Sequence, residues 1–232
     1  MKNIIKCHFN YFINKVTIIS LILVVVVSSL GFIYATEFLH GANDFASGNF
    51  YYFYNSLLIT KIIGTFLFIF IVGNCFLPKN DQYSYLLITS NVTRWCYFSL
   101  KIFSFLLLIF LFVWVIFCFY VVIGFLSSSN FIFNWDYFKS FSCLILFYSY
   151  YSLLGLLFVQ LTKNIYTIII PVAIVNVLNI LKENQQSLFF IYLFFPDFND
   201  NGRLLTFGLW HTLLLILFLF MINFYIYHKK DL

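Results

Sequence analysis

The sequence predicts an all-α membrane protein with six transmembrane helices, and three observations support this fold class. First, 63% of the 232 residues are hydrophobic and 9% are charged, whereas soluble domains are about 45–50% apolar and about 25% charged. Second, the mean hydropathy is +0.97, which indicates apolar surface in contact with lipid. Third, a helix needs roughly 20 apolar residues to cross a bilayer, and runs of about this length recur along the chain. They leave no room for a separate soluble domain, so residues 1–232 are predicted to be a single transmembrane domain.

Six apolar runs, separated by polar or helix-breaking residues, are the candidate spans. They cover residues 16–35, 56–77, 102–126, 140–162, 165–181 and 204–227. An even number of spans places both termini on one side of the membrane. Lys and Arg accumulate in cytoplasmic loops, and the basic residues on the side of the termini are Lys2, Lys6, Lys15, Lys79, Arg94, Lys101, Lys163, Lys229 and Lys230. On the other side are only Lys139, Lys182 and Arg203. We therefore predict that both termini are cytoplasmic.

Residues 1–15 form a basic, amphipathic N-terminal segment. Ile5, Phe9 and Phe12 share one helical stripe, whereas Lys2 and Lys6 lie on another side. This pattern predicts a helix that lies in the inner membrane interface before the first span. The alternative is a basic tail that only sets the orientation of the chain.

Residues 79–101, between the second and third spans, are too polar to cross the membrane and too apolar for a solvated loop. Apolar spacing of i, i+3 and i+4 predicts a short amphipathic helix there. The members of that stripe are Tyr83, Leu86 and Leu87. Ser90 or Asn91 can cap a following helix that leads into the third span. A cytoplasmic helix with exposed Leu and Tyr is a predicted docking surface for a partner.

Residues 183–203, between the fifth and sixth spans, form the third informative segment. Their apolar run, 188–195, is too short to cross the membrane and is closed by Pro196 and Asp197. We predict a re-entrant segment in the outer leaflet, with Phe195, Pro196 and Asp197 at its end. Such backbone is tolerated at membrane depth only against protein or a water-filled cavity.

These features, in this order, resemble the membrane subunits of ABC-2 type exporters. The local pattern in that family is an acidic residue, a Leu-rich helix, a small-residue break, an Arg and then a Lys. The corresponding residues here are Asp81, Leu86, Leu87, Ser90, Asn91, Arg94 and Lys101. The sequence departs from the family in three places. Asp81 stands where the family usually has Glu, and the Gly often found near Ser84 and the Pro usually found near Val92 are missing. A narrower resemblance is to exporters of phenol-soluble modulins, which are small amphipathic peptides.

The resemblance implies a permease in the bacterial cytoplasmic membrane. It implies two kinds of protein partner: a cytoplasmic ATPase that docks on residues 81–94, and a second permease chain, which is either an identical or a related subunit. The chain itself would bind no cofactor, and ATP and Mg would be bound by the ATPase. The other partners would be membrane lipid and the substrate, and nucleic acid is not implied.

Five polar residues within or beside the spans are candidate pathway residues: Lys61, Tyr148, Tyr151, Asn176 and Asn179. The alternative for Lys61 is a side chain that extends to the headgroups. The alternative for the two tyrosines, which have small residues as neighbours, is a helix–helix interface.

The chain is not predicted to be an enzyme. It contains none of the phosphate-binding, zinc-protease or serine-hydrolase motifs, and no acidic residue lies inside a predicted span. The five cysteines have no paired spacing, which indicates reduced thiols.

A hydrophilic solute would meet few polar groups along these spans. We therefore expect export of an amphipathic peptide or another lipophilic molecule, and a basic one would meet Asp197 and Asp200 at the exit. The alternatives are the substrate-capture subunit of a vitamin-type importer, an intramembrane enzyme and a structural membrane protein.

Overall fold

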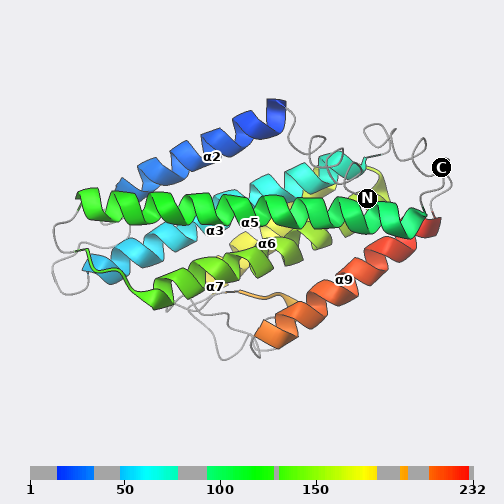
Figure 1. Ribbon diagram of the computed structural model, residues 1–232. Helices are drawn as coiled ribbons and strands as arrows, with labels where there is room; N and C mark the ends of the chain where they lie inside the picture. The colour runs from blue at the N-terminus through cyan, green and yellow to red at the C-terminus, as the bar shows by residue number, and fades with distance from the viewer. Residues whose placement is uncertain are drawn as a thin grey trace.

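The computed structural model describes residues 15–33, 48–77, 93–127, 131–181, 194–197 and 209–229. Within these ranges the chain forms helices and no β-strand. The helices are α2 (Lys15–Ile33), α3 (Gly48–Phe76), α5 (Arg94–Ser127), α6 (Trp135–Thr162), the 3-10 turn η2 (Ile165–Ile168), α7 (Ile169–Leu181) and α9 (Leu209–Lys229). Figure 1 shows the long helices lying side by side as an elongated bundle.

In the part of the chain that the structure describes, four helices are long and apolar enough to cross a membrane. These stretches are Tyr52–Phe76, Arg94–Leu126, Trp135–Thr162 and Leu209–Lys229. Two shorter apolar helices, Thr17–Ile33 and Ile165–Val177, accompany them. The described part of the protein is therefore all-helical and multi-pass, which confirms the predicted all-α membrane class, while the number of six spans and the side of the termini stay predictions.

Each predicted apolar run falls on a helix, but α3, α5 and α6 begin earlier than the runs do. The additional first turns of α3 and α5 carry aromatic residues that pack inside the bundle. Tyr52 and Phe53 are 4% and 2% exposed, and Tyr97 and Phe98 are similarly buried. Burial of these rings stabilises helical turns that lie beyond the most apolar part of each run.

Helix α6 is the centre of the bundle, in contact with α3, α5, α7 and α9. In both α3 and α6, 67% of the most apolar stretch is buried, compared with 17% in α9. Helix α2 packs on α3 and α5 at the edge of the bundle (Figure 1). The core is therefore formed chiefly between α3 and α6.

Local sequence signals fix both ends of α6. The Asn134 side chain accepts a hydrogen bond of 2.9 Å from the backbone N–H of Asp136, as expected of an N-cap residue. Asp136 adds negative charge at the positive end of the helix dipole. At the other end Lys163 has φ 56° and its backbone N–H donates to the Val159 carbonyl at 2.8 Å. This left-handed residue stops α6 and allows the chain to turn into η2.

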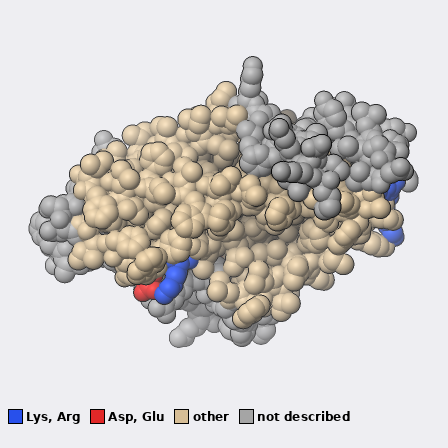
Figure 2. All heavy atoms as spheres, viewed as in Figure 1, with Lys and Arg blue, Asp and Glu red and all other residues tan. Residues whose placement is uncertain are grey.

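The outer surface of the bundle is apolar over most of its length. In Figure 2 the central part of the visible face is free of Lys, Arg, Asp and Glu among the described residues, and charged atoms lie toward the ends. Large exposed hydrophobic side chains include Ile19, Leu111, Phe125, Leu214 and Phe218. This surface is typical of contact with lipid.

The predicted interfacial helix lies outside the described residues, apart from residue 15. Helices α2 and α5 run one way along the bundle, whereas α3, α6 and α9 run the other way (Figure 1).

Candidate functional site

A buried ion pair links α3 to the segment that precedes α9. The Lys61 Nζ atom lies 2.6 Å from Oδ1 of Asp197, and both side chains are 2% exposed. The two residues are 136 positions apart in the chain. The Lys61 nitrogen also lies 5.6 Å from the centre of the Phe147 ring, within the range of a cation–π contact. Lys61 therefore does not extend to the surface, and its charge is neutralised inside the protein.

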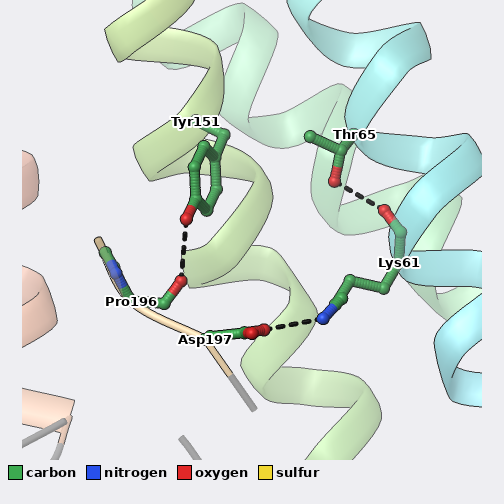
Figure 3. Close-up of polar contacts among 5 residues, drawn as sticks. All are labelled: Lys61, Thr65, Tyr151, Pro196 and Asp197. Atoms are coloured by element: carbon green, nitrogen blue, oxygen red, sulfur yellow. Dashed lines mark hydrogen bonds and ion pairs between the residues drawn. The ribbon is translucent and has the colours of Figure 1, made fainter. Parts of the chain in front are cut away.

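Residues 194–197 are held against α6 by two tyrosine hydroxyls. The Tyr150 hydroxyl donates to the Phe194 carbonyl, and the Tyr151 hydroxyl donates to the Pro196 carbonyl at 3.0 Å. Figure 3 shows Tyr151 reaching this segment from one side while Asp197 points toward Lys61 on the other. Pro196 and Asp197 are buried and non-helical, whereas Phe194 is exposed. Because non-helical backbone carbonyls need partners when they are buried, the Tyr151 hydroxyl makes it possible for the Pro196 end of this segment to pack inside the bundle.

Helices α3 and α6 approach closely beside the ion pair because α3 carries a glycine there. A Cβ atom added to Gly64 would lie 2.5 Å from Cζ of Tyr148. The Tyr148 side chain is fully buried, and its hydroxyl donates to the Thr60 carbonyl at 2.6 Å. Its ring also packs on Phe68, with the ring centres 5.2 Å apart. Glycine at position 64 thus provides the space for the Tyr148 ring.

A second polar cluster joins three helix ends at the C-terminal end of α3. Lys101 is fully buried, and its ammonium donates to the Cys75 carbonyl at 2.8 Å and lies 4.1 Å from the centre of the Phe76 ring. Arg94 Nη1 donates to the His228 carbonyl at 2.7 Å. Both accepting carbonyls lie in the last turn of a helix, where backbone oxygens lack helical partners and the dipole is negative. The first turns of α5 therefore bind the ends of α3 and α9.

The structure brings together some of the predicted site residues and separates others. Lys61, Tyr151 and residues 195–197 form one cluster, with Tyr148 beside it. Asn176 lies on the exposed surface of α7, away from this cluster, and the side chain of Asn179 is outside the described part. The predicted ATPase-coupling residues that lie outside the described residues are Asp81, Tyr83, Leu86, Leu87, Ser90 and Asn91. Arg94 is the only member of that set that the structure describes.

Sequence reasoning missed several contacts of these clusters. Tyr150 was not distinguished from its neighbours, and the target of Lys101 was not predicted. Charge was the signal that could have indicated the Lys61–Asp197 pair. A lysine inside an apolar span needs a partner, and Asp197 follows the apolar run that is too short to cross the membrane. Nothing in the local sequence, however, indicates which lysine meets which acid.

Neither polar cluster, as far as the structure describes it, resembles a metal centre. In the described ranges no group of three His, Cys, Asp or Glu residues could hold a metal ion. A cavity of about 510 Å³ lies elsewhere, between α2 and α5, and is lined by apolar side chains such as Leu21, Val25 and Leu108. The chemistry of the candidate site is therefore charge neutralisation and hydrogen bonding of the backbone.

We expect Lys101→Met to lower the free energy of unfolding by about 1.5–3 kcal/mol, the range for hydrogen bonds to charged groups. The ammonium that contacts the end of α3 would be lost, while an apolar side chain of similar length would remain. Thermal unfolding in detergent micelles would measure the change. Lys139→Met is the matched control, because Lys139 is 73% exposed and pairs with Asp136 at the surface. Equal unfolding temperatures for the two variants would contradict the role of Lys101.

The sequence matches no protein-family model, and no curated protein matches it.

Proposed function

We propose that the chain is the permease subunit of an ATP-driven ABC-2 type exporter in the bacterial cytoplasmic membrane. Its substrate would be an amphipathic peptide or another lipophilic molecule, moved outward. The observation that carries the proposal is the short stretch 194–197, which is non-helical from residue 195, is buried in the apolar bundle at Pro196 and Asp197, and is held by Lys61 and two tyrosines. A re-entrant segment before the last helix is a feature of the family that the sequence resembles.

The contacts at the start of α5 support a mechanical role for the coupling segment. Arg94 and Lys101 tie α5 to the ends of α9 and α3. Movement of residues 79–93 by a docked ATPase would therefore be transmitted to three helices at once. In this proposal six helices span the membrane with both termini in the cytoplasm, and two permease chains form the pathway.

The ATPase is expected to dock through the apolar stripe of residues 83–87. Leu86→Asp combined with Leu87→Asp would place charge in an apolar contact, and an unpaired desolvated charge costs several kcal/mol, about 3–5 in order of magnitude. We therefore expect the double variant to lose copurification of the partner ATPase. The peptide-stimulated ATPase activity of the complex should be lost as well.

A matched control makes the same two changes at exposed apolar positions near the other end of α5. Leu126 and Ile132 are 81% and 70% exposed, and Leu126→Asp with Ile132→Asp should leave copurification intact. Unchanged copurification of the Leu86 and Leu87 variant would count against the docking segment. Uptake of a vitamin by cells that express the complex, without export of peptide, would favour the importer alternative.

A further inference from the structure

Residues 194–197 are attached to the bundle by two tyrosine hydroxyls and by the Lys61–Asp197 ion pair. Of these three contacts, the ion pair is the one between formal charges. A neutral hydrogen bond contributes modestly to stability, whereas separating two buried charges leaves each in a medium of low polarity. The ion pair is therefore the contact that most strongly opposes detachment of this segment.

The surroundings of Lys61 restrict what could replace the Asp197 carboxylate. The ammonium is buried between α3 and α6, and the Phe147 ring lies 5.6 Å from it. A small hydrated anion would have to lose its water to reach this position. An anionic group carried on an apolar body would already lie in the membrane, and its apolar part could follow the lipid-facing surface of the bundle.

We infer that Lys61 is an anion-exchange site, at which the anionic group of an amphipathic molecule replaces the carboxylate of Asp197. Exchange keeps the lysine charge neutralised while residues 194–197 detach from α3. This inference rests on the proposed function, because it names the class of exported substrate as an anionic amphiphile. It also changes the sequence expectation for Asp197, which is engaged by Lys61 and is not an open acidic group for a basic substrate.

Hydrogen exchange of the backbone amides tests the inference on the unmodified chain. The full chain, without an ATPase, would be placed in phosphatidylcholine nanodiscs, and mass spectrometry would follow the peptide that contains residues 194–197. Sodium dodecanoate should raise the exchange rate of this peptide about tenfold, which corresponds to 1.4 kcal/mol. Dodecanol, which has the same chain without the charge, should leave the rate unchanged.

Two variants separate exchange at Lys61 from a general detergent effect. Lys61→Met combined with Asp197→Asn removes both charges, and its exchange rate should be the same in dodecanoate as in dodecanol. Lys139→Met, which removes an exposed lysine, should keep the difference. An equal response of the unmodified chain to both amphiphiles, or a response that persists in the double variant, would overturn the inference.

The source of the anion is tested by replacing phosphatidylcholine with phosphatidylglycerol. If phosphatidylglycerol alone raises the hydrogen-exchange rate of residues 194–197, and the rise depends on Lys61, the result would support the anion-exchange site and identify a lipid headgroup as an occupant. The hydrogen-exchange test uses no ATPase and is therefore independent of the proposed function. If dodecanoate fails to raise the hydrogen-exchange rate, while the complex with the ATPase still shows peptide-stimulated ATPase activity, the anion site alone would be rejected. If dodecanoate has the expected effect but no ATPase copurifies with the chain from cells, the anion site would stand and the exporter proposal would be rejected.

Discussion

Replacing Lys61 by Met should lower the free energy of unfolding by about 3–5 kcal/mol, the typical effect of breaking a buried ion pair from one side. The Asp197 carboxylate would remain 2% exposed without the ammonium that now lies 2.6 Å away. The negative charge of Asp197 would then either stay buried without that cation, or residues 194–197 would have to leave the bundle. Either response lowers the stability of the packed state.

The double variant Lys61→Met/Asp197→Asn is the decisive comparison. A buried pair replaced on both sides by neutral groups of similar size is often close to neutral in stability. We therefore expect the double variant to recover most of the loss, as measured by reversible unfolding in mixed micelles. Additive losses from the two substitutions would show that the residues do not act as a pair.

Replacing Gly64 by Ala should also destabilise the protein strongly, by about 3 kcal/mol, at the upper end of the usual range for overpacking. The new methyl group would overlap the ring of Tyr148. This ring cannot easily move, because it is fully buried, packs on Phe68 and is hydrogen-bonded to Thr60. Helices α3 and α6 would have to separate, and the neighbouring Lys61 contact would be strained.

Gly73→Ala supplies the matched control for Gly64→Ala, since both substitutions lie in α3 and change helix propensity equally. The methyl group at position 73 would meet the γ2 methyl groups of Ile168 and Val159 at 3.2 Å, whereas the methyl group at position 64 would lie 2.5 Å from Cζ of Tyr148. Gly73→Ala should therefore lower the unfolding temperature less than Gly64→Ala does. Adding Tyr148→Leu to Gly64→Ala should restore part of the stability. Equal effects of the two glycine substitutions would contradict the close approach at Tyr148.

Much of the helical framework could be predicted from the sequence because its signals are local. All six apolar runs coincide with helices. The start of α6 carries local signals in Asn134 and Asp136, but the hydropathy pattern placed it too late, at residue 140. The starts of α3 and α5 could not be located in this way. Their first turns are stabilised by aromatic rings that pack on other helices, so hydropathy alone places the boundaries too late.

Most residues of the candidate site could be predicted from the sequence, but the contacts between them could not. The lysine inside a span and the short apolar run ending in Pro196 and Asp197 both depart from the ordinary pattern of a membrane helix. The sequence does not reveal that one neutralises the other. Arg94 and Lys101 were expected from a family pattern, yet their contacts with the ends of α9 and α3 follow from helix packing.

The sequence by itself determined that this protein is helical and lies in a membrane, since hydropathy and capping depend on neighbouring residues and on the solvent around each helix. The tertiary structure alone decided that Lys61 meets Asp197, that Tyr148 fills the space at Gly64 and that Lys101 binds the end of α3. Each of these contacts joins different elements. Each depends on the relative position and rotation of packed helices, which are set by side-chain shape and by the need to neutralise buried charge.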